Sequence, residues 1–286
     1  MMAVRVGFHV SIAGGISNSV NNAKRIGCGA FQIFSRNPRT WAAKLMPADE
    51  VQSFKNKLME SGIDKNSVVV HMPYLPNLSG PQGEFYNKSV EVLTEQVNVC
   101  EALDIPYLVV HLGSHMGKGP KSGVDQLVKA ISKASVKSHS GLVILLENSA
   151  GQKNSIGSTF EELRLILDKL GNSGKYGICI DTCHLFASGY DLRKIDDVEG
   201  MFKTFKDIVG PKEIKLVHLN DSKGTLASKV DRHEHIGLGS IGIEGIASFL
   251  KLHEIRALPI IMETPIDDRR TNEENLKIVM NVLRRP

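Results

Sequence analysis

The chain has 286 residues, is 42% hydrophobic and carries a formal net charge of +4. Its length suits one α/β barrel, which commonly reaches about 250 residues as a single domain. Its apolar runs fall short of the roughly 20 residues that a membrane-spanning helix needs, and its N-terminus lacks the basic and apolar regions of a signal peptide. These properties exclude a membrane-embedded protein, and we expect a cytoplasmic one with no membrane partner.

Eight short runs rich in valine and isoleucine predict buried strands at residues 4–10, 30–35, 67–72, 107–112, 142–148, 176–181, 214–220 and 258–264. They are almost continuously apolar, as is typical of parallel strands covered on both faces. Between them, amphipathic patterns predict helices, among others at residues 47–62, 123–138, 159–170 and 271–285. Thr159 with Glu162, and Thr271 with Glu274, have the spacing of a helix-capping box.

Strict alternation of strand and helix predicts parallel strands joined by right-handed crossovers. An open doubly wound sheet is the alternative, but it would need a glycine-rich turn after the first strand. SIAGG at residues 11–15 lacks the GxGxxG spacing of such a turn. Eight units close best as a barrel, so we predict the α/β class and a (β/α)8 TIM barrel, with residues 1–286 forming one domain.

Residues that can bind metal lie at or just beyond the ends of the predicted strands, where a barrel of this type has its active site. They are His71, His111, Glu147, Asp181, His184, His218, Asp231, His233 and Glu263. A single histidine at such a place is more often a structural hydrogen-bonding group. Here, however, six consecutive strands end in His, Asp or Glu, and burying so many of these groups without a cation would be very costly. The pattern therefore predicts a metal cluster.

Imidazole and carboxylate ligands suit zinc, with manganese or iron possible. At three or four ligands per ion and one shared carboxylate, these residues suffice for three ions. Asp181 and His184 flank a turn and should face different ions, whereas Asp231 and His233 should face the same one. Clustered divalent ions favour hydrolysis of a phosphate ester, because they activate water and neutralise phosphate oxygens. The four cysteines form no CxxC pair and are expected as reduced thiols; the role of Cys183, beside the cluster, stays open.

The positive charge is uneven and indicates a polyanionic substrate. Residues 1–48 contain no acidic residue, and residues 118–137 contain five lysines and one aspartate. The loop after the second strand carries Arg36, Arg39 and Trp41, and the loop after the third carries Tyr74 and Leu75. For Trp41, packing of a helix onto the barrel is the favoured interpretation. For Tyr74 and Leu75 we favour entry into a DNA groove, where they would replace an extruded base.

Five motifs carry a resemblance to a known family: HVSIAGG at 9–15, ENSAGQ at 147–152, IDTCHLFASGYD at 180–191, HLNDSKGTLASKVDRHEHIGLGSIG at 218–242, and METP at 262–265. Over essentially its whole length, the chain resembles the endonuclease IV family of zinc-dependent apurinic/apyrimidinic endonucleases. The resemblance implies a TIM barrel that hydrolyses double-stranded DNA 5′ to an abasic site, leaves a 3′-hydroxyl, and trims blocked 3′ ends. We expect a monomer, because one barrel can clamp DNA alone.

The resemblance also implies roles for individual residues. One zinc ion would be bound by His71, His111 and Glu147; the second by Glu147, Asp181, His218 and Glu263; the third by His184, Asp231 and His233. Glu147 would bridge two ions and be essential for catalysis, and Mn²⁺ could replace zinc in some sites. Arg39, Tyr74 and Leu75 fall on the positions that penetrate DNA. Lys153 and Leu112 depart from residues common in the family, which leaves the range of lesions open.

Two other functions fit parts of the pattern. A metal-dependent sugar isomerase or epimerase uses the same barrel, but it would leave His184, Asp231 and His233 without a role. A noncatalytic DNA-damage-binding protein could keep the metals for structure alone, although the ligand set here lacks no carboxylate.

Overall fold

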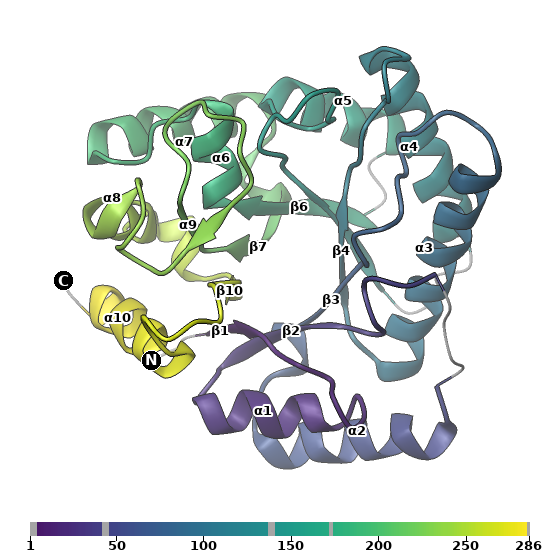
Figure 1. Ribbon diagram of the computed structural model, residues 1–286, viewed down its shortest axis with the longest axis horizontal. Coiled ribbons are helices and arrows are strands. Elements are labelled where there is room, and N and C mark those ends of the chain that lie inside the picture. The colour runs from purple at the N-terminus through teal and green to yellow at the C-terminus, as the bar shows by residue number, and fades with distance from the viewer. Residues whose placement is uncertain (1–4, 42–45, 137–140, 172–173, 285–286) are drawn as a thin grey trace.

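A computed structural model describes residues 5–41, 46–136, 141–171 and 174–284. Eight parallel strands form a closed barrel in the order β1-β10-β7-β6-β5-β4-β3-β2 (Figure 1). The strands are β1 (Val6–His9), β2 (Ala30–Phe34), β3 (Val68–His71), β4 (Tyr107–His111), β5 (Val143–Glu147), β6 (Tyr176–Asp181), β7 (Ile214–His218) and β10 (Ile260–Met262). Each lies within a predicted run, so the predicted TIM barrel is confirmed; Val4, the predicted start of the first strand, lies outside the described residues.

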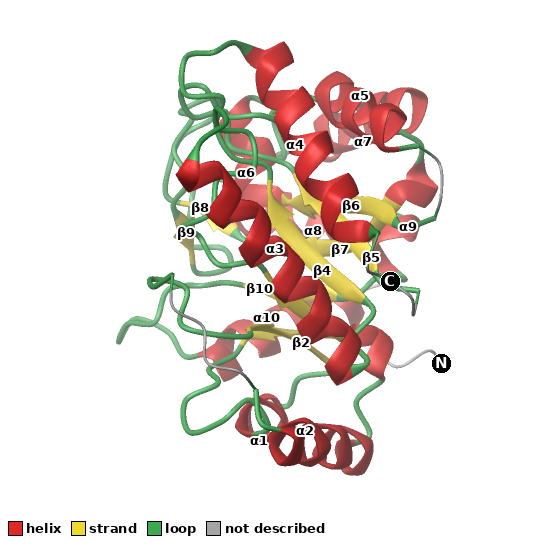
Figure 2. Cartoon of the chain, turned by 90° about the vertical axis from the view of Figure 1, so that its right-hand side faces the viewer, coloured by secondary structure: helices red, strands yellow, loops and turns green. Residues whose placement is uncertain are grey.

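Helices surround the barrel, and the loops that follow the strands gather on one side of it, at the left of Figure 2. The helices are α1 (Asn18–Ile26), α2 (Ala48–Ser61), α3 (Glu84–Leu103), α4 (Pro120–Ser135), α5 (Phe160–Leu170), α6 (Thr182–Ser188), α7 (Ile195–Ile208), α8 (Gly242–Leu250), α9 (His253–Arg256) and α10 (Asn272–Arg284), with short 3₁₀ turns η1 (Lys65–Ser67) and η2 (Pro211–Glu213). Within the described ranges, no helix is both long and apolar enough to cross a membrane.

The two predicted capping boxes form to different extents. At α10 the box is reciprocal: the Thr271 amide donates to Glu274 Oε2 at 2.7 Å, and the Glu274 amide donates to Thr271 Oγ1 at 3.2 Å. At α5, Thr159 Oγ1 accepts from the Glu162 amide at 3.3 Å, but the Glu162 carboxylate accepts from residues 157 and 158 instead. α4 begins at Pro120, three residues before the predicted start, because proline is well suited to the first turn of a helix.

Alternation along the strands separates two apolar layers. Outward-facing residues pack under the helices, whereas inward-facing residues form an interior layer of their own: Ala30, Val69, Val109, Leu145, Cys179, Leu216 and Ile261. Side chains two positions apart on a strand point to the same face. The residues two positions further on therefore also point to the barrel axis, and they are Gln32, His71, His111, Glu147, Asp181, His218 and Glu263. The apolar register thus determines where the polar groups meet.

Gly7 occupies the tightest place in this interior layer. A Cβ atom on Gly7 would lie 1.7 Å from the Ala30 carbonyl oxygen on the adjacent strand, so any side chain would force β1 and β2 apart. We expect Gly7→Ala to destabilise the protein by about 1–3 kcal/mol or more, the usual cost of overpacking a core.

The measurement is urea unfolding of metal-replete protein, with Gly200→Ala as the control. Gly200 lies in α7 and has open space around it, so its replacement should stabilise the helix by up to about 1 kcal/mol. A Gly7→Ala midpoint equal to that of wild type would contradict the proposed packing constraint.

Candidate metal centre

All nine predicted ligands converge at the mouth of the barrel. Six come from the ends of β3 to β7 and from the residue after β10. His184 lies in α6, which begins directly after Asp181, and the Asp181 carboxylate caps that helix by accepting from the His184 amide at 2.8 Å. Asp231 and His233 lie between β7 and α8, where β8 (Asp221–Ser222) and β9 (His233–Glu234) form a small antiparallel pair.

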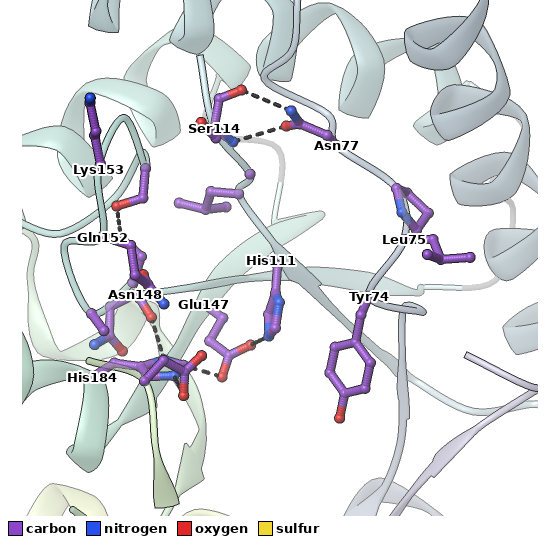
Figure 3. Close-up of a pocket in the computed structure, with 17 residues that line it drawn as sticks. Tyr74, Leu75, Asn77, His111, Ser114, Glu147, Asn148, Gln152, Lys153 and His184 are labelled. Carbon is purple, nitrogen blue, oxygen red and sulfur yellow. Dashed lines mark hydrogen bonds and ion pairs between the residues drawn. The ribbon is translucent and has the colours of Figure 1, made fainter. Parts of the chain in front are cut away.

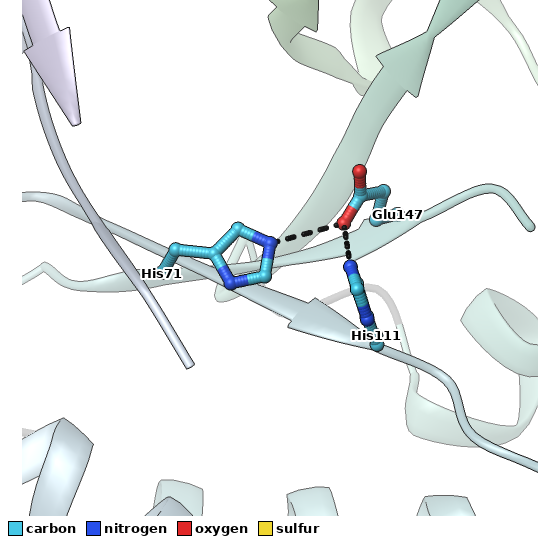
Figure 4. Close-up of side chains that lie close together, drawn as sticks. All are labelled: His71, His111 and Glu147. Carbon is cyan, nitrogen blue, oxygen red and sulfur yellow. Dashed lines mark hydrogen bonds and ion pairs between the residues drawn. The ribbon is translucent and has the colours of Figure 1, made fainter. Parts of the chain in front are cut away.

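Glu147 is the centre of the arrangement. The Nε2 atoms of His71 and His111 lie 3.2 and 3.0 Å from its Oε2 atom (Figure 4). Its Oε1 atom lies 2.8 Å from Nδ1 of His218. Because its two oxygens face different imidazoles, Glu147 has the geometry of a carboxylate that can bridge two cations.

Three groups of potential ligand atoms consist of histidine and carboxylate alone, and two further groups include Cys179 or Cys183. Within each group they lie within 4.8 Å of one another, and the first three groups are His71–His111–Glu147, Glu147–Asp181–His218–Glu263 and His184–Asp231–His233. Asp181 and His184 therefore fall in different groups, and Asp231 and His233 share one, as their spacing predicted. These are the sets that the family resemblance implies.

Hydrogen bonds fix which nitrogen each of two histidines presents to the centre. His71 Nδ1 donates to the Met72 carbonyl at 2.7 Å, and His184 Nδ1 donates to the Asn148 carbonyl at 2.9 Å. In the neutral imidazole, Nε2 then carries a lone pair. In both cases this lone pair faces a carboxylate oxygen, which for His184 is Asp231 Oδ1 at 3.1 Å. Two electron-rich atoms so close require a proton or a cation between them.

The need for a cation is clearest in the third group, His184–Asp231–His233. Among the described side chains, Nε2 of His184 and Nε2 of His233 are buried without a hydrogen-bond partner of normal geometry. Leaving buried polar atoms unsatisfied is unfavourable, and a bound cation would satisfy both. The donor set of imidazole and carboxylate therefore fits a metal ion.

The electrostatics of the centre keep its carboxylates charged. Burial favours the neutral form of Glu147, but His111 and His218 hold its pKa well below the ordinary value. Burial opposes the charge of Asp231 as well, yet the adjacent imidazole of His184 lowers its pKa to about 2. The same carboxylates raise the pKa of His184 and His218 well above the ordinary value, so without a metal ion protonated imidazoles balance the charged carboxylates.

The cysteines near the centre, unlike the carboxylates, are uncharged. All four are buried and free of disulfides. Burial raises the pKa of the Cys179 thiol to about 12 and raises that of Cys183 as well, so without a cation both are neutral thiols. Cys179 belongs to the interior layer of the barrel, and Cys183 Sγ donates to the Arg232 carbonyl. These contacts favour a packing role for both.

Two buried asparagines and one aspartate support the ligands, and the sequence analysis did not identify them. Asn148 joins its side-chain amide to the Asp181 backbone through both its oxygen and its nitrogen, at 2.7 and 3.2 Å. Asn220 donates to Asp181 Oδ2 at 2.7 Å and accepts from the Glu263 amide at 2.8 Å. Their position in the sequence could have indicated the two asparagines, because each follows a predicted ligand by one or two residues.

Asp221 organises the segment that carries the third group. Its buried carboxylate accepts from five backbone amides, those of Ser222, Gly237, Gly239, Ile241 and Gly242, at 2.8 to 3.3 Å. Pairing of Ser222 with His233 across β8 and β9 then sets the position of that histidine. The segment between β7 and α8 is therefore anchored at both ends.

A cavity of about 340 Å³ opens beside the centre and is lined by Glu147, His111, Asp231, Tyr74 and Leu75, among others (Figure 3). Its wall consists of loops that follow β3, β4 and β5.

Asn77 joins two of these loops: its Nδ2 donates to the Ser114 carbonyl and its Oδ1 accepts from the Ser114 amide, both at 2.9 Å. A Cβ atom on Gly113, which has a φ of +84°, would lie 2.3 Å from Asn77 Oδ1. Ser114 also pairs with Ser155 of the third loop.

Of the predicted DNA-contact residues, Tyr74 and Leu75 line this cavity, and Arg39 lies on the loop after β2. Tyr74 is 57% exposed, with its ring centroid 4.9 Å from that of Phe34, and Arg39 is exposed. Arg36 is paired with Glu95 at 2.9 Å. Their contacts with DNA stay predictions. Trp41 lies against Phe85 at a centroid distance of 5.1 Å and contacts the core, which supports the packing interpretation.

Two histidines outside the ligand set also lie at or shortly after a strand end, His9 at the end of β1 and His115 after β4. His9 Nδ1 lies 3.5 Å from Glu263 Oε1, so it does adjoin the centre. His115 instead accepts from the Gly119 amide at 3.0 Å and serves the loop before α4.

Comparison with known proteins agrees with this geometry. A sequence family described as xylose isomerase-like TIM barrel matches residues 20–285. A probable endonuclease 4 of Cenarchaeum symbiosum is 50% identical over 275 residues, covering 96% of this chain and 98% of that protein. The crystal structure of endonuclease IV from Thermus thermophilus superposes with a TM-score of 0.85 at 35% identity, with 98% of each chain covered.

A D-tagatose 3-epimerase-like protein superposes with a TM-score of 0.73 at 19% identity, covering 98% of this chain and 97% of that one, and therefore shares the fold alone. The close similarity over nearly the full length lies with the nucleases: the chain belongs to the endonuclease IV family.

Proposed function

We propose that the protein is a DNA-repair endonuclease that hydrolyses the phosphodiester 5′ to an abasic site, leaves a 3′-hydroxyl, and also trims blocked 3′ ends. The observation that carries the proposal is the position of Glu147, whose two oxygens face two different groups of potential ligands. Adjacent cations sharing a carboxylate suit hydrolysis of a phosphodiester, in which both the attacking and the leaving oxygen need stabilisation.

Three zinc ions are the proposed cofactors, one for each ligand group, with Mn²⁺ possible in some sites. The donor set supports zinc because it combines imidazole with carboxylate. When bound, such ions supply activated water and positive charge for the phosphate oxygens. The chain's own contribution is to hold the ligands in place: Asn148 and Asn220 fix Asp181, and Asp221 fixes the segment of Asp231 and His233.

Double-stranded DNA containing the lesion is the proposed partner, and the proposed active form is a cytoplasmic monomer. Exposed cations in the segments that follow β4, β5 and β7 support a phosphate-binding face, namely Lys118, Lys121, Lys153, Lys223, Lys229 and Arg232. Lys44 in the basic stretch 1–48 and Lys137 in the basic stretch 118–137 lie outside the described residues. Arg39, Tyr74 and Leu75 would enter the duplex, and the cavity beside Glu147 would receive the extruded abasic residue.

Glu147→Gln keeps the size of the side chain but removes the charge shared by two groups. We expect cleavage of an abasic duplex to fall by about 1000-fold, the scale of losing a key electrostatic group of an active site, with binding largely spared. Cleavage is followed on a labelled duplex, and binding by fluorescence anisotropy.

The matched control is Glu161→Gln on the exposed face of α5, which should cleave as wild type does. Unchanged cleavage by Glu147→Gln would remove this residue from the mechanism. Retained binding without cleavage by the wild-type protein itself would favour the noncatalytic damage binder.

Removal of metal gives a second test. Wild-type protein treated for long periods with a strong zinc chelator should lose cleavage of the abasic duplex, and added zinc should restore it, because the Nε2 atoms of His184 and His233 are buried without a hydrogen-bond partner among the described residues. Elemental analysis of untreated protein should find three zinc equivalents per chain. Full activity of a preparation shown to be metal-free would disprove a metal-dependent mechanism.

Tyr74 and Leu75 can be tested apart from the metal centre. In a Tyr74→Ala/Leu75→Ala double variant, cleavage of the abasic duplex should fall by about 10–100-fold, since loss of one base–aromatic stacking contact costs about 1–3 kcal/mol. Hydrolysis of bis(p-nitrophenyl) phosphate, which requires no base displacement, should stay at the wild-type rate. Met59→Ala, which removes another exposed apolar side chain in α2, is the control. Equal losses on both substrates would contradict a role in opening the duplex.

A further inference from the structure

Gln32 is a fully buried polar residue at the candidate metal centre, and it has none of the roles described above. It lies on β2, two residues after Ala30 of the interior layer, and its side chain points to the barrel axis. Its side-chain partners are His9, His218 and Glu263. Two of these three are proposed metal ligands, and they come from the opposite end of the chain.

The contacts of Gln32 determine the orientation of its amide. Nε2 lies 2.6 Å from Glu263 Oε1 and 3.0 Å from His9 Nδ1, and Oε1 lies 2.8 Å from His218 Nε2. The amide nitrogen has two hydrogens to donate, and the oxygen only accepts. The reverse orientation would place this oxygen against a charged carboxylate. Gln32 therefore donates to Glu263 and His9, and accepts from the Nε2 proton of His218.

This orientation of the Gln32 amide determines which atoms of His218 and Glu263 are free to bind a metal ion. With its proton on Nε2, His218 carries its lone pair on Nδ1, which lies 2.8 Å from Glu147 Oε1. On Glu263, the bond from Gln32 occupies Oε1, and the other oxygen, Oε2, lies 3.5 Å from the same His218 Nδ1. Gln32 thus leaves His218 Nδ1 and Glu263 Oε2 free and directed toward the same place.

We propose that Gln32 is a positioning residue of the second ligand group, holding His218 and Glu263 in the tautomer and orientation in which both can bind one metal ion. The inference rests on the proposed function, because it assumes that this group binds metal. Partners that orient a metal ligand through a hydrogen bond typically contribute roughly 10- to 100-fold in metal affinity.

The test is Gln32→Met, which keeps the length of the side chain and removes its hydrogen bonds to both ligands. Zinc-loaded protein is titrated with a chelator, and the zinc that remains bound is counted. We expect the variant to release one equivalent at about 10- to 100-fold lower free chelator than wild type. Gln96→Met is the matched control: Gln96 is equally buried, but its oxygen accepts from Ser35, which is no ligand.

A purely structural role is distinguished by melting temperature. Zinc raises the stability of the folded state according to its affinity. Gln32→Met should therefore reduce the rise in melting temperature that zinc produces, while the metal-stripped variant melts close to metal-stripped wild type. If Gln32→Met fails to fold, Gln32→Asn, whose shorter amide cannot reach both partners, takes its place with the same expectations.

The outcomes separate the two proposals. A wild-type chelator profile in the Gln32 variants, or an equal fall in melting temperature with and without zinc, would overturn the role of Gln32 and leave the nuclease proposal intact. Wild-type protein that binds no zinc in this group would overturn the proposed three-metal centre, and the inference with it.

Discussion

The constraint on which the rest of the structure depends is the charge collected at the mouth of the barrel. Four carboxylates and five imidazoles share a space whose floor is an apolar layer, so water cannot solvate them from below. Such a set is stable only with compensating cations and with a partner for every remaining donor and acceptor. Asn148, Asn220 and Gln32 supply those partners, and each joins strands that carry different ligands.

Two kinds of support hold the ligands. Ligands at strand ends are placed by the parallel ladder itself, in which His111 pairs with Glu147 and Asp181 with His218. Asp231 and His233 come from a segment outside the barrel, which the buried carboxylate of Asp221 holds through its bonds to backbone amides. The epimerase-like protein shares the fold alone, and a fold by itself does not determine the chemistry that it carries.

Much of the fold was accessible from the sequence because the apolar runs are short, nearly continuous and regularly spaced. The strands end at His71, His111, Glu147, Asp181 and His218, within two residues of the ends of the predicted runs, since the change from apolar to polar residue is abrupt in a barrel. Gln32 could not be found in this way: its partners His218 and Glu263 are 186 and 231 residues away. Asp221 was missed for a different reason, because its carboxylate is bound by backbone amides, which leave no residue pattern.

The bond pair between Asn77 and Ser114, together with the bridge from Ser114 to Ser155, makes three loops of the cavity wall into one structural unit. Exchanging any one of them with a relative would leave partly buried amide or carbonyl groups unpaired in the other two. Grafts designed to alter which lesion the cavity accepts should therefore transfer all three loops as a block.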